Sequence, residues 1–243
     1  MTWSILARDR SGRLGVAIAS RFFAVGALCV HTRGDVGAIA TQALVNPMYG
    51  SQGLALLAAG HDAVATVALL TAADAGREQR QLHVLPWQGA AAVHTGTGCV
   101  GWCGHLVQDG ISLAGNMLAG PQVLQASAQA FADAEGLTLA ERLIAALVAG
   151  DAAGGDKRGR QSAALRIQGP EDYPELDLRV DDHESPFTEL QRLHAKSLER
   201  FQPFATCLPR RAMPAGELDR SRIEAAIERF TAERLLQPRS PNP

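Results

Sequence analysis

The sequence begins with Met1-Thr2-Trp3-Ser4-Ile5-Leu6-Ala7-Arg8, a mostly apolar run with the character of a β-strand. Thr2 is small enough for a methionine aminopeptidase to accept, so removal of Met1 would leave a threonine at the N-terminus. Such a residue carries a hydroxyl and a free α-amine, which together make a nucleophile with its own general base. An unperturbed α-amine has a pKa of about 7.7–8.0, so part of it is free base at pH 7. The alternative is that Thr2 is an ordinary first residue of a strand.

The composition excludes several classes of protein. Hydrophobic residues make up 47% of the 243 residues, enough for a sizeable core, whereas aromatic residues make up only 5%. The formal net charge of −2 gives no reason to expect nucleic acid or a membrane as a partner. The first residues lack a signal pattern, and no apolar run reaches the ~18 residues that span a bilayer. We therefore expect a cytoplasmic protein and, from the apolar fraction, a homodimer.

The four cysteines, Cys29, Cys99, Cys103 and Cys207, suit reduced thiols better than a disulfide framework. Cys99 and Cys103 precede His105 closely in the sequence, but no second pair of ligands follows at the spacing of a zinc site. We expect buried free thiols, no metal and no cofactor.

Strand-like and helix-like segments come in blocks rather than in alternation. The predicted strands are residues 3–9, 14–20, 25–32, 36–42, 79–86, 90–95, 111–116, 160–167 and 176–180. The predicted helices are residues 49–59, 62–73, 121–134 and 138–150, a segment from Pro186 with an apolar stripe to Phe201, and residues 217–236. This order predicts an α+β protein with antiparallel sheets. The early strands and the later strands would form two facing sheets, with the helix pairs outside them.

The density of proline, arginine and charge rises from Pro203. We therefore predict one domain over residues 1–202 and a C-terminal appendage over residues 203–243. The appendage would contain one helix and a Pro-rich tail, residues 237–243, that is disordered.

Three loop-like segments place polar residues at strand ends. Ser20 and Arg21 end the second predicted strand, and Arg21 offers a fork of donors for a carboxylate. Gln42 and Asn46 follow the fourth strand and can bind an amide or an oxyanion. Asn116 lies between glycines at another strand end, where a tight turn explains it equally well. The simpler interpretations of the other residues are a surface ion pair for Arg21 and turn chemistry for Asn46.

A fourth segment, residues 150–164, is rich in glycine and carries Asp156, Lys157 and Arg158. It lacks the order of a phosphate loop, but main-chain N–H groups beside cations suit an anion or oxyanion site. A solvated charged turn is the alternative. Downstream, Asp181 and His183 suggest acid–base or metal chemistry, or simply the polar end of a strand before a capped helix.

Taken together, these motifs resemble a bacterial family that is labelled as a domain of unknown function and described as having an N-terminal-nucleophile (Ntn) hydrolase-like fold. The matching stretches are TWSI (2–5), ASRFFAVG (19–26), ATQALVNP (40–47), GNML (115–118), GGDKRGRQSA (154–163) and LRVDDH (178–183). The resemblance covers roughly residues 1–198. It implies a four-layer αββα sandwich of two antiparallel sheets and an amide-bond hydrolase.

The mechanism expected from this resemblance begins with Thr2 exposed by removal of Met1, without autocleavage. Its amine would take the hydroxyl proton and its alkoxide would attack an amide, with Asn116 or Asn46 and main-chain N–H groups holding the oxyanion. Arg21 and the loop over residues 156–158 would hold a substrate carboxylate or tune the amine. The substrate would be a small amide, imide or acylated amino acid.

Ser20 and Gln42 complete the expected substrate site, and Asp181 and His183 are further candidates. Two other functions stay open. One is a small-molecule-binding or scaffold protein on the same fold, which would keep Met1. The other is a metal-dependent hydrolase that uses Asp181, Asp182 and His183.

Overall fold

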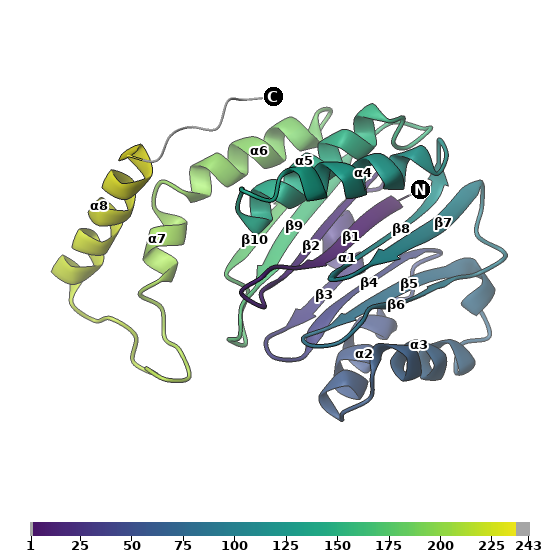
Figure 1. The fold of residues 1–243 in the computed structure, drawn as a ribbon, viewed down its shortest axis with the longest axis horizontal. Coiled ribbons are helices and arrows are strands. Elements are labelled where there is room, and N and C mark those ends of the chain that lie inside the picture. Colours follow the sequence, from purple (N-terminus) through teal and green to yellow (C-terminus); the bar gives the residue numbers. More distant parts are fainter. Residues whose placement is uncertain (1, 237–243) are drawn as a thin grey trace. The chain divides into compact units, whose positions relative to one another are not determined.

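The computed structural model describes residues 2–236, which fold around two antiparallel sheets (Figure 1). The six-stranded first sheet has the order β10 (Leu176–Val180), β9 (Ser162–Gln168), β2 (Leu14–Ser20), β1 (Thr2–Arg8), β8 (Ile111–Leu118) and β7 (Trp102–Gln108). The four-stranded second sheet has the order β3 (Val30–Arg33), β4 (Gly37–Ala43), β5 (Arg80–Pro86) and β6 (Ala92–Thr95). The predicted α+β class with antiparallel sheets is confirmed.

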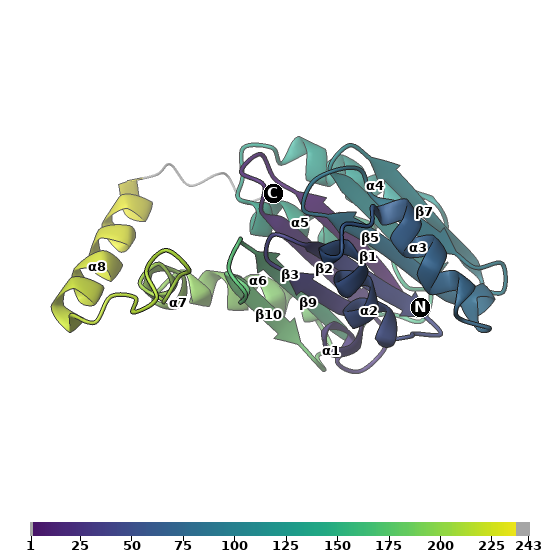
Figure 2. The same cartoon turned by 90° about the horizontal axis from the view of Figure 1, so that it is seen from below.

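Helices cover the outer face of each sheet (Figures 1 and 2). The second sheet is covered by α2 (Met48–Ala58) and α3 (Ala63–Ala72), and the first by α4 (Gln122–Asp133), α5 (Leu139–Ala152) and the start of α6 (Pro186–Ser197). The arrangement is the predicted αββα sandwich. The shorter helices are α1 (Val25–Cys29) and the 3₁₀ turn η1 (Arg77–Gln79). None of the helices in the described chain is long and apolar enough to cross a membrane.

The alternation of side chains along β1 joins the two layers that flank it. Trp3 faces the helices, and its ring centroid lies 5.8 Å from that of Phe187 in α6. Leu6 faces the other way and belongs to a buried cluster with Ala38 and Leu85 of the second sheet. Successive residues of a strand point to opposite faces, so Thr2 and Ser4 share the face of Leu6 and point between the sheets.

Local sequence signals fix the ends of several helices. The Asp62 side chain accepts a hydrogen bond from the Ala65 N–H, at 2.7 Å, and caps α3. Thr138 and Glu141 form a capping box at the start of α5. Gly60 ends α2 with a φ of 93°, a conformation that favours glycine.

Four structural predictions need correction. Residues 25–32 are not one strand, because Ala24 has a φ of 51° and starts the short helix α1 before β3. The edge strand β7 was not predicted, since Gly104 interrupts its pattern. The apolar stripe from Pro186 ends with α6, and Phe201 starts a separate helix. The early strands divide between the sheets, with β1 and β2 in the first and β3 and β4 in the second.

The cysteines are free, as predicted, but only Cys29 is fully buried, and burial raises the pKa of its thiol to about 12. Contacts divide the chain into two compact units, Met1–Gln191 and Arg192–Pro243. The second unit contains α7 (Phe201–Ala205) and α8 (Arg220–Leu236), with Ile227 of α8 buried. The proposed domain boundary after residue 202 stays a prediction, and the predicted tail, residues 237–243, lies outside the described residues.

The contact between α2 and β3 gives a test of this packing. A Cβ atom at Gly50 of α2 would lie 2.1 Å from Cγ of His31, and the His31 ring is tied through Nε2 to the Leu28 carbonyl at 3.1 Å. Alanine normally stabilises a helix interior by about 1 kcal/mol over glycine. We expect Gly50→Ala to lower the free energy of unfolding instead, by about 1–3 kcal/mol, because the ring cannot move aside. The measurement is urea unfolding.

The matched control is Ser51→Ala, on the exposed face of the same helix. It gains helix propensity without meeting a neighbour, so its free energy of unfolding should stay equal or rise slightly. A higher free energy of unfolding for Gly50→Ala than for the wild type would show that α2 does not pack closely against the His31 ring.

Candidate active site

One end of the first sheet carries a row of polar side chains on neighbouring strands. Thr2 of β1 lies opposite Ser20 of β2 on one side and opposite Asn116 of β8 on the other. The row continues to Ser162 of β9, beside Ser20, and to Cys103 of β7, beside Asn116. Residues directly opposite on neighbouring strands point to the same face of a sheet. The five side chains therefore share the face that looks toward the second sheet.

Thr2 is buried and hydrogen-bonded at the centre of this row. Only 8% of the residue is exposed, and its Oγ1 lies 3.1 Å from Oγ of Ser20, which is also buried. The Thr2 carbonyl accepts a hydrogen bond from Nε2 of Gln42 on β4, at 3.4 Å. Three of the predicted site residues, Thr2, Ser20 and Gln42, are thus in direct contact.

Gln42 belongs to a group of buried amides that joins the two sheets. Its Nε2 donates to Oε1 of Gln81 on β5, at 3.0 Å. The same Oε1 accepts a hydrogen bond from Nδ2 of Asn116, at 2.9 Å. Gln42, Gln81 and Asn116 are each at most 3% exposed. The structure therefore links predicted residues of β1, β4 and β8 through Gln81, which the sequence did not indicate.

A buried histidine extends the group along β5. Nε2 of His83 lies 2.8 Å from Oγ of Ser4, and Nδ1 lies 3.0 Å from Oγ of Ser112. Ser4 donates in turn to Oε1 of Gln42, at 2.6 Å. His83 is completely buried, and this burial, with a smaller contribution from His105, lowers the pKa of the imidazole to about 3. His83 is therefore neutral at physiological pH.

Sequence reasoning missed Ser4, Gln81, His83 and Ser112, which all lie between the sheets. A signal was present in β5, where Gln81 and His83 alternate with Leu82 and Val84. Such alternation normally predicts a face in contact with water. Here the polar face is buried because it meets polar side chains of the other sheet.

The glycine-rich loop before β9 lies beside the Ser20 end of the row. The Asp156 side chain is buried, and its carboxylate accepts hydrogen bonds from the N–H groups of Arg21, at 3.2 Å, and Arg158, at 2.7 Å. Arg158 also forms an ion pair with it, at 3.3 Å. Nη1 of Arg21 donates to the Arg160 carbonyl, at 3.2 Å, and Lys157 is exposed. Asp156 therefore shapes the loop, and Arg21 and Lys157 remain near the row as exposed cations.

Asn46 is held in a different group of side chains. Its Nδ2 donates to the Asp74 carboxylate, at 3.1 Å, and its Oδ1 accepts from the Met48 N–H. Tyr49 and Arg80 also bond Asp74, and the Tyr49 hydrogen bond is the main reason that the pKa of the Asp74 carboxyl lies well below its usual range. These contacts hold Asn46 at the start of α2, with partners that do not belong to the polar row.

The acidic stretch after β10 also has local partners. Asp181 pairs with Arg179, at 2.7 Å, and Nδ1 of His183 accepts a hydrogen bond from the Ser185 N–H, at 2.9 Å. Asp182 accepts from Gln161, at 3.0 Å. Over residues 2–236, no three His, Cys, Asp or Glu side chains come together as a metal site. This stretch therefore gives no support to the metal-dependent alternative.

Backbone strain marks the two strand ends nearest Thr2. Met117, directly after Asn116, has a φ of 55°, and Ala43, directly after Gln42, has a φ of 70°. Residues other than glycine rarely adopt this left-handed conformation, and it is frequent at functional sites.

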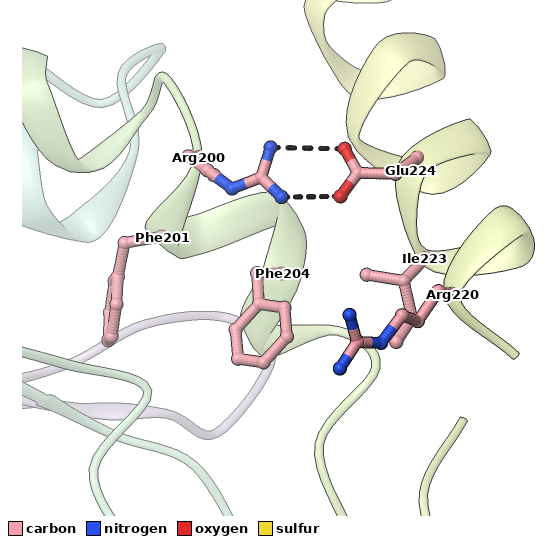
Figure 3. A pocket seen from close by; sticks show the side chains of 6 residues that line it. All are labelled: Arg200, Phe201, Phe204, Arg220, Ile223 and Glu224. Atoms are coloured by element: carbon pink, nitrogen blue, oxygen red, sulfur yellow. Dashed lines mark hydrogen bonds and ion pairs between the residues drawn. The ribbon is translucent and has the colours of Figure 1, made fainter. Parts of the chain in front are cut away.

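The C-terminal unit contains a separate hollow of about 530 Å³, between α7 and α8 (Figure 3). Phe201, Phe204 and Ile223 line it with apolar side chains. Arg200 and Glu224 form two parallel hydrogen bonds at its edge. None of the residues that line this hollow is a predicted site residue, and none belongs to the polar row.

Comparisons with known proteins agree with the predicted family. The family model described as "Family of unknown function (DUF1028)" matches residues 2–190. The crystal structure of protein SPO2555 from Silicibacter pomeroyi, assigned to the same family model, is 32% identical, with a TM-score of 0.83 over 90% of this chain and 96% of that chain. Anbu (ancestral beta-subunit) from Yersinia bercovieri is 14% identical, with a TM-score of 0.37 over 81% of this chain and 94% of that chain. No curated protein matches the chain.

The lowered pKa of His83 predicts how stability depends on pH. An unfolded histidine takes up a proton below about pH 6.5, whereas folded His83 does so only near pH 3. Between these values the unfolded state binds more protons, so the free energy of unfolding falls as the pH falls. We expect His83→Gln to flatten this fall by up to about 1.4 kcal/mol per pH unit. The measurement is urea unfolding from pH 4 to pH 8.

His61→Gln provides the control, because the His61 side chain is exposed. The free energy of unfolding of this variant should depend on pH in the same way as that of the wild type. If the free energy of unfolding changed with pH at the same slope in the wild type and in His83→Gln, folded His83 would take up its proton over the same pH range as unfolded His83.

Proposed function

We propose a function for this chain from the residues of its site. The chain belongs to the DUF1028 family, and the description of that family gives no function. The proposed function is that of an Ntn-type amidohydrolase. Thr2 would be its nucleophile after removal of Met1, and its substrate a small amide, imide or acylated amino acid.

The position of Thr2 is the observation that carries this proposal. Thr2 begins a strand that is paired on both sides, and its hydroxyl lies 3.1 Å from Ser20. Its cross-strand neighbour Asn116 carries an amide. Removal of one residue would therefore add an amine to a hydroxyl and two polar neighbours that already lie together. That is the set of groups that a self-activating nucleophile needs.

The proposed reaction has two stages. The amine of Thr2 takes the proton of its own hydroxyl as the oxygen attacks the amide carbonyl. Main-chain N–H groups and the second N–H of Asn116 Nδ2 hold the resulting oxyanion. When the intermediate collapses, the leaving amine takes the proton from the Thr2 ammonium. Water, activated by the same amine, then hydrolyses the ester on Thr2 and restores the hydroxyl.

The surroundings of the row support a substrate that combines an anion with an apolar group. In the part of the chain that the structure describes, no ion pair involves the Arg21 side chain. The Arg21 guanidinium can therefore bind a substrate carboxylate by donating hydrogen bonds to it. Phe22 and Leu44 are each more than half exposed, and each lies two residues beyond a side chain that contacts Thr2. An acylated amino acid with an apolar acyl group presents both chemistries.

A binding or scaffold protein is the second candidate, and the burial of Thr2 favours it. Thr2 is 8% exposed and is already bonded to Ser20 and Gln42. A protein of this kind would keep Met1, and replacing Thr2 would leave ligand binding intact.

The first test is the chemistry of the N-terminus. We expect untagged protein from a bacterial cytoplasm to have an intact mass that lacks one methionine. A β-lactone should then add its full mass to Thr2, because the hydroxyl opens the ring without a leaving group. Labelling is measured by intact mass and peptide mapping.

Three variants separate the outcomes. Thr2→Ser should keep the labelling, whereas Thr2→Ala and a chain with an uncleaved N-terminal extension should lose it. A full-length mass that retains Met1, or labelling that survives in Thr2→Ala, would remove Thr2 as the nucleophile and favour the binding protein.

The role of Arg21 has its own test. In an acylated amino acid series, Arg21→Gln should raise KM about tenfold for free carboxylates and leave KM unchanged for the matched primary amides. The value of kcat should change little, since Arg21 binds a part of the substrate that does not react. An equal change for acids and amides would show that Arg21 does not recognise the carboxylate.

A further inference from the structure

We propose that Gln81 is a positioning residue: it fixes the direction of the buried hydrogen bonds from Ser112 to Asn116 and thereby anchors Thr2. The role in catalysis rests on the proposed function, whereas the direction of the hydrogen bonds does not.

Main-chain carbonyls fix the orientation of the Gln81 amide. Its Nε2 lies 2.8 Å from the Gly115 carbonyl and 3.2 Å from the Gly104 carbonyl. A carbonyl oxygen only accepts hydrogen bonds, so the NH₂ group must face these two strands. Oε1 must then face the opposite direction, toward Gln42 and Asn116.

The oxygen of Gln81 decides how its two neighbours are turned. Oε1 only accepts, so Nε2 of Gln42, at 3.0 Å, and Nδ2 of Asn116, at 2.9 Å, must both donate to it. With its NH₂ group on this side, Gln42 also donates to the Thr2 carbonyl, at 3.4 Å. Gln81 therefore fixes which atoms of both amides are presented to Thr2.

The same direction continues to the buried histidine. Oε1 of Gln42 accepts the only hydroxyl proton of Ser4, at 2.6 Å. Ser4 must consequently accept at its oxygen from Nε2 of His83, at 2.8 Å. Nδ1 of His83 then carries no proton and accepts from Ser112, at 3.0 Å. His83 is thus the neutral Nε2–H tautomer, which agrees with its lowered pKa.

Reversing one amide would not be a local change. If the Gln81 amide were reversed, its NH₂ group would face the donors of Gln42 and Asn116, and its oxygen would face the Gly115 carbonyl. Both clashes would lie in a region without access to water. Ser4, His83 and Ser112 have hydroxyl or imidazole protons that can move, and the amides of Gln42 and Asn116 are free to turn. Gln81 is bonded to fixed main-chain acceptors on β7 and β8, so it sets the direction for the others.

This anchoring matters most at a chain terminus. Terminal residues fray unless they are tied down. After removal of Met1, Thr2 would be the terminal residue, and a nucleophile must stay within a fraction of an ångström of its productive position. The hydrogen bond from Gln42 holds the Thr2 carbonyl from the opposite sheet, and Gln81 holds Gln42 in the orientation that makes this bond.

The test replaces Gln81 with glutamic acid and with methionine. A protonated glutamic acid has one donor for Gly115 and one acceptor for Gln42 and Asn116, whereas an ionised one has acceptors only. Burial raises the pKa of such a carboxyl, so it titrates in an accessible range. The titratable groups that face this position are His83 on β5, Cys103 and His105 on β7 and, after removal of Met1, the amine of Thr2.

The readout is the rate of β-lactone labelling of Thr2 relative to the wild type, from pH 5 to pH 8. Gln81→Glu should label at least tenfold more slowly than the wild type at pH 8 and approach the wild-type rate toward pH 5. Gln81→Met should show a similar deficit at every pH. Gln108→Glu, the same change at an exposed position of β7, should match the wild type throughout.

A second readout is independent of catalysis. Nitrogen-15 NMR of histidine-labelled wild type should show His83 as the Nε2–H tautomer from pH 5 to pH 8, with the signal assigned by its loss in His83→Gln. An Nδ1–H tautomer would overturn the proposed direction. If the wild type shows the Nε2–H tautomer but does not label, the proposed function fails while the hydrogen-bond direction holds.

Folded Gln81→Glu and Gln81→Met proteins that label at the wild-type rate would overturn the positioning role. If neither variant folds, Gln42→Glu gives the same test at the residue that bonds Thr2 directly. Its ionised form cannot donate to the Thr2 carbonyl, so the same loss at pH 8 and recovery toward pH 5 is expected. An unchanged rate in Gln42→Glu would overturn the role as well.

Discussion

The pairing of β1 on both of its edges is the constraint on which the rest of this structure depends. β2 and β8 both hold β1 as far as Thr2, where a terminal strand normally frays. Thr2 is thereby fixed beside Ser20 and Asn116, which come from distant parts of the chain. The alternation of β1 then divides its side chains between a helix-facing set that begins with Trp3 and a sheet-facing set that begins with Thr2.

The interior between the sheets is unusual because part of it is polar. Ser4, His83 and Ser112 are completely buried, and each buried polar group that lacks a partner would cost about 1–3 kcal/mol. Each has a partner, so the group tolerates burial, but aliphatic side chains would fill the same space without this requirement. The polar side chains instead specify how the two sheets are aligned, because their hydrogen bonds form only in the correct alignment. The polar interior lies beside the row that contains Thr2.

The sequence predicted the layers well and the polar interior poorly, for a physical reason. Capping and turn residues such as Asp62 and Thr138 act through their immediate neighbours, so they can be recognised one segment at a time. The motifs that contain Ser20, Gln42 and Asn116 were also visible as polar residues at strand ends. Gln81 was not, because its role depends on carbonyls of β7 and β8 that lie far along the chain. Asn46 looked equally suitable in the sequence, yet Asp74 holds its amide.

Under the proposed function, the same geometry would let the cleavage of one bond separate an inactive chain from an active one. While Met1 is attached, the nitrogen of Thr2 is an amide and cannot act as a base, even though the hydroxyl already lies 3.1 Å from Ser20. Cleavage would change no contact among Gln42, Gln81 and Asn116, because these bonds involve side chains and the Thr2 carbonyl. The new amine would form in a largely buried setting, which disfavours its charged form and so favours the free base. A preassembled interior therefore suits activation by a single proteolytic step, because the residues around Thr2 need no rearrangement.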